Sequence, residues 1–143
     1  MNKTSQWHFY FLLIIFGIMI NTIIESFVIR LGFVFYNVTP TFLGIWWFTF
    51  VIYVPWVALT YKLGNLMSRK FKINKLFFYF LVGALFAFSI DQYATSIGLY
   101  GYSWDSVFYI LKVPIEDFFA VGTMITISVA ISEHAARFLL KAS

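Results

Sequence analysis

Four apolar stretches, each long enough to cross a lipid bilayer, constrain the fold of this chain more than any other feature. They cover residues 9–29, 41–61, 76–97 and 108–132. A helix of about 20 apolar residues spans the roughly 30 Å hydrocarbon layer of a membrane. With 62% of its 143 residues hydrophobic and only 11% charged, the chain is too apolar for a soluble domain. The sequence therefore predicts an all-α integral membrane protein with four transmembrane helices in one domain, residues 1–143.

The distribution of basic residues predicts how these helices are oriented. The connection between the second and third stretches, residues 62–75, contains five basic residues and no acid. Cytoplasmic loops of membrane proteins carry an excess of Lys and Arg. We therefore expect this loop and both chain termini in the cytoplasm, with the protein integral to the cell (inner) membrane. The first stretch lacks the small-residue cleavage pattern of a secretory signal, so we expect it to be a retained membrane helix.

Residue types that are scarce in the chain exclude several kinds of site. There is no cysteine, which excludes a disulfide, a thiolate nucleophile and a thiolate-bound metal. The two histidines, His8 and His134, lie near opposite ends of the chain and do not indicate a metal site. We expect no metal and no cofactor. Because the basic residues that give the net charge of +4 set the topology or contact anionic lipids, no nucleic-acid partner is expected.

A sequence pattern recurs at an offset of 66 in the residue numbering, called the repeat spacing below. The pattern G-x7-[E/D]-x6-G-x3-Y occurs twice, as Gly17, Glu25, Gly32 and Tyr36 and again as Gly83, Asp91, Gly98 and Tyr102. We interpret it as two tandem helical hairpins inserted in the same direction. Hairpin one covers residues 7–63 and hairpin two residues 76–134, joined by the basic loop. Overall identity at the repeat spacing is low, so coincidence stays open as an alternative.

Four carboxylic acids fall in the external half of the predicted membrane: Glu25, Asp91, Glu116 and Asp117. Pro114 suits the first position of the fourth helix, which places the last two acids in its first turn. A carboxylate in hydrocarbon costs about 2.5 kcal/mol or more, so such acids usually face the bundle interior and mark a pathway or a reaction. Carboxyls that are crowded together away from water cannot all ionise. We expect at least one to keep its proton, and these four are our candidate catalytic residues.

Two structural interpretations of the acids remain open at this point. Glu25 can pair with Arg30, and Glu116 or Asp117 with Lys112, as salt bridges that join the helices. If the helices end early, the acids instead lie among the lipid headgroups. In both interpretations the acids have no chemical function.

The stretch "DQYATSIGLYGYSW" followed by "VPIEDFF" resembles the lycopene cyclase domain of the membrane-embedded, flavin-independent carotenoid cyclases. That family carries an aspartate upstream of a Gly and Tyr/Trp cluster, and then a P-x-E-[E/D] motif that opens a helix. The similarity covers residues 83–122, and the matching residues are Asp91, Gly98, Tyr102, Pro114, Glu116 and Asp117. The stretch "ESFVIRLGFVFYN" in the first hairpin is similar to the upstream part of the same pattern.

The resemblance implies that the protein isomerises a carotenoid or a related lipid-soluble isoprenoid without redox change. An acid protonates a terminal double bond, the neighbouring double bond attacks the carbocation to close a six-membered ring, and a base removes a proton. The resemblance implies Glu116 or Asp117 as the acid, with Asp91 and Glu25 as its partner or as the final base. Aromatic faces stabilise the cation, and Asn21 shares a helix face with Glu25. The candidate substrate-binding residues are Asn21, Tyr36, Tyr102, Trp104, Phe118 and Phe119.

The sequence departs from the family pattern in two ways. At the position that corresponds to "PIED", the first hairpin has "FTFV", Phe48–Val51, which lacks both acids. Four helices are predicted, whereas a single half of a family member more often has three. We therefore expect a homodimer or a heterodimer with a related membrane half. Two other functions stay open: transport of protons or ions along the acids, and a role as a non-catalytic membrane subunit.

Overall fold

The computed structural model describes residues 3–39, 42–103, 105–106 and 108–142. Its four helices are α1 (Lys3–Arg30), α2 (Trp47–Phe71), α3 (Lys75–Ser96) and α4 (Ile115–Ala142). The four-helix, all-α arrangement predicted from the sequence is confirmed. Four short strands accompany the helices: β1 (Val34–Tyr36), β2 (Tyr100–Tyr102), β3 (Tyr109–Ile110) and β4 (Val113–Pro114). The strands form two antiparallel pairs, β1 with β2 and β3 with β4, which the sequence did not predict.

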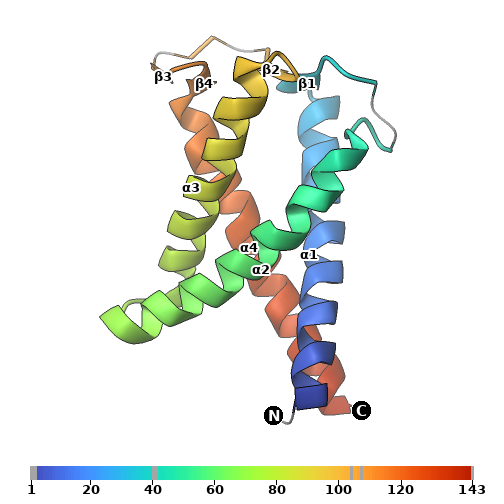
Figure 1. The fold of residues 1–143 in the computed structure, drawn as a ribbon, viewed down its shortest axis with the longest axis vertical. Helices are drawn as coiled ribbons and strands as arrows, with labels where there is room; N and C mark the ends of the chain where they lie inside the picture. The colour runs from blue at the N-terminus through green and yellow to red at the C-terminus, as the bar shows by residue number, and fades with distance from the viewer. Residues whose placement is uncertain (1–2, 40–41, 104, 107, 143) are drawn as a thin grey trace.

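The helices form a bundle with two distinct ends (Figure 1). The strands lie at one end, called the strand end below, and both chain termini lie at the other, called the terminal end. The most extensive contacts of α4 are with α3 and α1, while α2 packs mainly against α3 and runs obliquely across the bundle. Chain direction therefore alternates along the bundle from each helix to the next.

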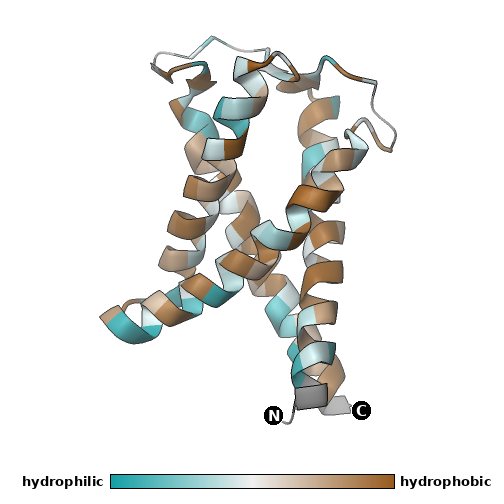
Figure 2. Cartoon of the chain, viewed as in Figure 1, coloured by the Kyte–Doolittle hydropathy of each residue, from teal (hydrophilic) through white to brown (hydrophobic). Residues whose placement is uncertain are grey.

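Three helices are long and apolar enough to cross a membrane, over the segments Gln6–Arg30, Lys75–Ser96 and Ile115–Leu140. They indicate an integral, multi-pass membrane protein. Large apolar side chains such as Phe27 and Ile131 are exposed on their surfaces, as expected of helices that face lipid. In Figure 2 the apolar residues of these helices are brown, and more hydrophilic residues are teal towards the end of α2 that leads into α3. The 25-residue α2 is long enough to span a membrane, but its sequence is less apolar and is not among the three segments.

Three helices differ from the predicted stretches 9–29, 41–61 and 108–132: α1 begins six residues earlier, at Lys3, and α2 and α4 begin and end several residues later. The predicted basic loop is mostly helical, because α2 continues to Phe71 and α3 begins at Lys75. Lys and Arg are good helix formers, and the Asn74 side chain caps α3 by accepting a hydrogen bond from the Leu76 amide at 2.9 Å. The fourth helix begins at Ile115, directly after Pro114. Its first turn contains both acids of the "PIED" motif, as the proline predicted.

Small residues bring the helices close together. A Cβ atom added at Gly17 on α1 would lie 2.7 Å from the side chain of Val57 on α2. At Gly83 on α3 it would overlap Cγ2 of Ile125 on α4. Both positions are closer than van der Waals contact, so only glycine fits at these two crossings. The crossings fix the depth of each helix against its neighbour.

We expect Gly83→Ala to lower the free energy of unfolding by about 1–3 kcal/mol, because the added methyl group forces α3 and α4 apart. Thermal unfolding in detergent measures the change. Leu85→Ala is the matched control, since Leu85 is exposed on the same helix and its truncation leaves the crossing intact. Equal losses of stability in the two variants would contradict the close packing at Gly83.

The ends of α1 and α3 have the same backbone geometry at positions related by the repeat spacing. Gly32 and Gly98 both have a φ of +76°, which favours glycine. Three backbone hydrogen bonds recur at this spacing: Leu31 to Phe27, Gly32 to Ile29 and Phe33 to Val28 match Ile97 to Tyr93, Gly98 to Thr95 and Leu99 to Ala94. Strands β1 and β2 follow these turns and pair with Phe35 opposite Gly101, which the repeat spacing also relates.

Candidate functional site

A cavity of about 660 Å³ lies between the four helices near the strand end. Its volume is within the range of small-molecule sites, roughly 300–1,000 Å³. Apolar and aromatic side chains form most of the wall, with Trp46, Tyr53 and Trp56 of the α2 segment among them. The indole nitrogen of Trp56 donates a hydrogen bond to the Gly83 carbonyl at 3.0 Å, which holds this ring in place. The cavity therefore suits an apolar ligand.

Four carboxylic acids from three helices line this cavity: Glu25 on α1, Asp91 on α3, and Glu116 and Asp117 on α4. Asp117 is only 4% exposed. The carboxyl groups of Asp91 and Asp117 lie next to each other. Two carboxylates this close and away from water repel each other, so we expect one of the two groups to keep its proton. The structure thus brings together the acids that the sequence placed in the external half of the membrane.

Tyr36 links the acid of α1 to α2. Its hydroxyl donates a hydrogen bond to Oε1 of Glu25 and lies 3.1 Å from Oγ1 of Thr49. Strand β1 holds the ring over the cavity by pairing Tyr36 with Tyr100, whose ring centroid is 5.2 Å away. Burial raises the pKa of Tyr36 above its usual value, and the Glu25 carboxyl raises it further. The phenol therefore stays protonated and remains a donor.

Two tyrosines of β2 lie beside the acids of α3 and α4. Tyr100 lines the cavity, and the Tyr102 side chain lies beside the Asp117 carboxyl. Burial raises the pKa of both phenols, and the nearby Asp91 carboxyl adds to the rise. Both side chains are therefore neutral donors at physiological pH.

The polar groups around the cavity form two similar sets. The set on the first half of the chain is Glu25, Tyr36 and Thr49, and the set on the second half is Asp91, Tyr102 and Asp117. In each set an acid near the end of one helix, a tyrosine on a strand and a polar group in the first turn of the next helix lie together. The two acids, Glu25 and Asp91, and the two tyrosines, Tyr36 and Tyr102, are separated by the repeat spacing of 66 residues. Thr49 and Asp117 are separated by two residues more.

The residue of the first hairpin that corresponds to the last acid of "PIED" lies two positions earlier than the alignment with "FTFV" predicted. The repeat spacing places Val51 opposite Asp117, whereas the structure places Thr49 there. The starts of α2 and α4, Trp47 and Ile115, show the same excess of two over the repeat spacing. The reason is the longer connection before α4, since residues 97–114 separate α3 from α4 and residues 31–46 separate α1 from α2.

Glu116 also lines the cavity, but its side chain is exposed, whereas that of Asp117 is buried. Its Oε2 atom accepts a hydrogen bond from Oγ of Ser106 at 2.5 Å. Successive residues of a helix point in directions about 100° apart, so the two adjacent acids face different surroundings. Of the two, the buried Asp117 is better placed to act as an acid inside the cavity.

Several predicted substrate-binding residues do not line the cavity. The rings of Phe118 and Phe119 pack on Phe80 of α3, with centroids 5.8 Å and 6.2 Å apart. Asn21 is fully buried between the helices, one turn from Glu25 towards the terminal end. Tyr102 contacts the acids and not the cavity, so Tyr36 alone of the described candidates is in its wall. Trp104 lies outside the described residues.

Three residues of the cavity wall, Thr49, Tyr100 and Trp56, were not predicted from the sequence. Thr49 carries no signal at the repeat spacing, and a spacing longer by two would have been needed to find it. Tyr100 is two residues before Tyr102, and their ring centroids are 5.2 Å apart. Nothing in the apolar sequence of α2 distinguishes Trp56 from aromatic residues that face lipid.

The cavity acids do not form the expected salt bridges. Within the described ranges, the ion pairs join Glu133 to Lys75 and to Arg137, both at the terminal end. Arg30 is exposed, and neither it nor Lys112 pairs with a cavity acid. The interpretation of Glu25, Glu116 and Asp117 as partners in salt bridges is therefore wrong for this structure.

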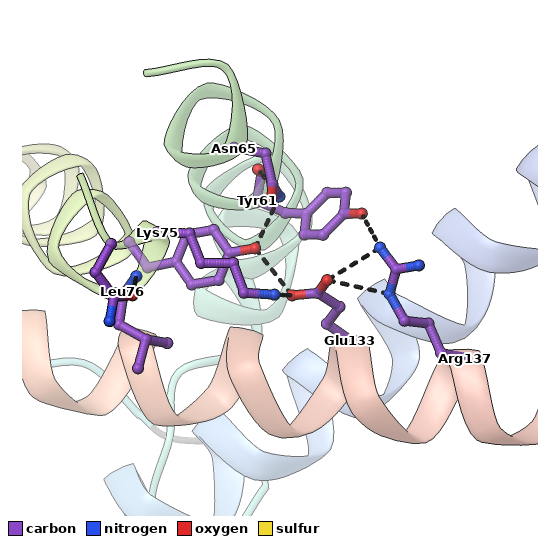
Figure 3. Close-up of polar contacts among 8 residues, drawn as sticks. Tyr61, Asn65, Lys75, Leu76, Glu133 and Arg137 are labelled. Carbon is purple, nitrogen blue, oxygen red and sulfur yellow. Dashed lines mark hydrogen bonds and ion pairs between the residues drawn. The ribbon is translucent and has the colours of Figure 1, made fainter. Parts of the chain in front are cut away.

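A separate polar cluster surrounds Glu133 at the terminal end (Figure 3). Glu133 is 4% exposed and accepts hydrogen bonds from Lys75 Nζ at 2.7 Å, from the Tyr79 hydroxyl at 3.0 Å and from Arg137 Nε at 3.1 Å. The Tyr79 hydroxyl in turn accepts a hydrogen bond from Nδ2 of Asn65 at 2.7 Å. These contacts join α2, α3 and α4.

We expect Glu133→Gln to lower the free energy of unfolding by about 1–3 kcal/mol, because the amide cannot pair with both cations. The loss is limited because Lys75 and Arg137 are partly exposed to solvent. Thermal unfolding in detergent measures it, with His134→Gln at the neighbouring exposed position as the control. An unchanged stability of Glu133→Gln would show that the cluster does not hold the helices together.

No family model matches the chain, and comparisons with curated proteins and with solved structures give no match either. Among the described residues, no group of three or more His, Asp and Glu side chains could hold a metal ion.

Proposed function

We propose that this protein is a membrane-embedded cyclase or isomerase of a carotenoid or a related isoprenoid, which works by proton transfer without redox change. One observation carries the proposal: acids from three helices line a single apolar cavity, and two of them, Asp91 and Asp117, lie side by side. A carboxyl pair with one proton supplies an acid, and a separate carboxylate supplies a base. The resemblance of residues 83–122 to lycopene cyclase domains supports the same chemistry.

In the proposed reaction, the Asp91–Asp117 pair gives its proton to a terminal double bond of the substrate. A C–H bond forms and leaves a tertiary carbocation on the neighbouring carbon. The electrons of the next double bond close a six-membered ring and move the positive charge to another carbon. The Glu25 carboxylate then removes a proton beside that charge, which restores a double bond. Substrate and product have the same formula, and one proton has moved from the pair to Glu25.

The residues around the acids have distinct roles in this proposal. Tyr36 is a positioning residue, because its hydrogen bond orients the Glu25 carboxylate. The rings of Trp56 and Tyr100 line the cavity and stabilise the carbocation through their electron-rich faces. The apolar wall excludes water, which would otherwise trap the cation as an alcohol.

The proposal includes a topology in which α2 is the fourth membrane span and the chain consists of two tandem hairpins. The recurring hydrogen bonds at the ends of α1 and α3 support the repeat. Both termini lie at the same end of the bundle, together with the basic residues of the α2–α3 connection (Figure 1). The positive-inside tendency then places that end in the cytoplasm and the protein in the cell inner membrane. A homodimer, or a heterodimer with a related membrane half, remains part of the proposal.

Expression in a bacterial host that accumulates lycopene tests the proposed function. We expect the wild-type chain, alone or with a related membrane half, to convert the red pigment into a yellow product of equal mass. Asp105→Asn, a change in the exposed connection before α4, is the control that should keep the conversion. If neither lycopene nor shorter acyclic isoprenoids added to the membranes give an isomer, the proposed function is wrong.

A further inference from the structure

A second group of buried polar side chains lies between the cavity and the terminal end. Asn21 is 0% exposed, and neither its amide nitrogen nor its amide oxygen has a hydrogen-bond partner in the described part of the chain. The hydroxyls of Tyr53, Thr60 and Ser132 are likewise buried, with no partner among the described residues. Buried polar groups of folded proteins nearly always have partners, and ordered water is a common one.

Contacts between α1 and α4 order these groups along the bundle. The Ser128 hydroxyl donates a hydrogen bond to the Gly17 carbonyl at 3.1 Å, which sets these two residues at one level. Asn21 lies one helical turn from Gly17 towards the strand end, on the face that also carries the acid of α1. Ser132 lies one turn from Ser128 towards the terminal end, at the level of Glu133. The buried polar groups of α1 and α4 therefore lie at successive depths along the bundle, and they are called the column below.

Helix α2 adds two groups to the same column. Because Gly17 packs on Val57, Thr60 lies about 4.5 Å further towards the terminal end, at 1.5 Å per residue. Tyr53 lies one turn from Val57 in the other direction, and it lines the cavity. The column therefore begins in the cavity wall and ends at the level of Glu133.

The spacing of the column suits water molecules. Neighbouring levels are about one helical turn apart, roughly 5.4 Å, which is too far for a direct hydrogen bond. Two hydrogen bonds of about 2.8 Å through one water molecule cover that distance. Without such partners, each buried group would cost about 1–3 kcal/mol.

We propose that Asn21, Tyr53, Thr60, Ser128 and Ser132 hold a file of ordered water molecules through which protons pass between the cavity and the Glu133 end of the bundle. Each oxygen in the file that gains a proton releases another to its neighbour. One proton therefore enters at one end as another leaves at the opposite end, and no group of the file is consumed. The purpose of the file rests on the proposed function: it removes the proton left on Glu25 and reloads the Asp91–Asp117 pair after each turnover.

Hydrogen–deuterium exchange of the protonated Asp91–Asp117 pair tests the file. Wild-type protein in lipid vesicles is transferred to D₂O, and infrared spectra follow the carboxylic acid C=O band as it moves to lower frequency. Asn21→Leu and Thr60→Val replace polar groups of the file with apolar side chains of similar size. We expect each to slow the exchange by about tenfold or more, the equivalent of losing one or more hydrogen bonds. Ser132→Ala removes only a hydroxyl and is the variant to use if the others do not fold.

Thr126→Val is the matched control, because the Thr126 hydroxyl already donates to the Gly122 carbonyl of its own helix at 2.7 Å. Its exchange should equal that of the wild type. Unchanged exchange in folded Asn21→Leu, Thr60→Val and Ser132→Ala would overturn the file. If these variants slow the exchange but the wild type converts no isoprenoid, the file stands and the proposed function falls.

Discussion

Asp117→Asn should reduce isoprenoid conversion by about 100-fold or more while the protein remains folded. The asparagine keeps the size of the side chain, and its amide can still donate a hydrogen bond to Asp91. It cannot hold a proton that is released to a carbon atom, so the first step of the proposed reaction is lost. The initial rate of product formation in membranes, normalised to the amount of folded protein, measures the effect.

Glu116→Gln is the control for Asp117→Asn. Glu116 is adjacent to Asp117 and belongs to the same motif, but its carboxylate is exposed and hydrogen-bonded to Ser106. We expect a loss of less than about tenfold, which one exposed hydrogen bond can explain. A large loss in Glu116→Gln together with a small loss in Asp117→Asn would show that the acid has been assigned to the wrong member of the motif.

Glu25→Gln should slow conversion by about 100- to 1,000-fold, because the amide cannot accept the proton that ends the proposed reaction. The variant still binds substrate, so the turnover number should fall while the Michaelis constant changes little. Product analysis adds a second readout: a cation without a base persists longer, and alcohols formed by water should increase among the products.

Tyr36→Phe separates the role of the base from that of its positioning residue. The hydroxyl of Tyr36 holds Glu25 and contacts Thr49, so its removal should slow turnover by about tenfold without altering the products. Thr49→Val removes the more distant of the two contacts and should have a smaller effect. If Glu25→Gln converts substrate at the wild-type rate, the base is not Glu25, and the Asp91–Asp117 pair would have to act as both acid and base.

The meeting of the cavity acids could be predicted from the sequence because a membrane limits where a carboxylate can lie. The constant rise of a helix gives the depth of each acid, and the high cost of a charge in lipid directs it towards the other helices. Glu25, Asp91 and Asp117 meet in one cavity for these two reasons. Glu116 shows the limit of the argument, since the depth of a residue near a helix end does not determine which way its side chain points.

The parts of the site that depend on connections between helices could not be predicted. Strand β1 pairs with β2 although α2 and α3 lie between them in the chain, and such short strands leave no local pattern in the sequence. The connection before α4 is two residues longer than the one before α2, which moved the equivalent of Asp117 from Val51 to Thr49. Asn21 was expected to bind substrate because it shares a helix face with Glu25. It lies one helical turn closer to the terminal end than Glu25 and so does not line the cavity.

The most direct test of the central claim is the infrared spectrum of the carboxyl groups in purified protein at neutral pH. The claim is that acids from three helices meet in an apolar cavity and that the Asp91–Asp117 pair retains one proton. It predicts a carboxylic acid C=O band in the wild type that loses intensity in both Asp91→Asn and Asp117→Asn and keeps its full intensity in Glu116→Gln. A wild-type spectrum with carboxylate bands alone would contradict it.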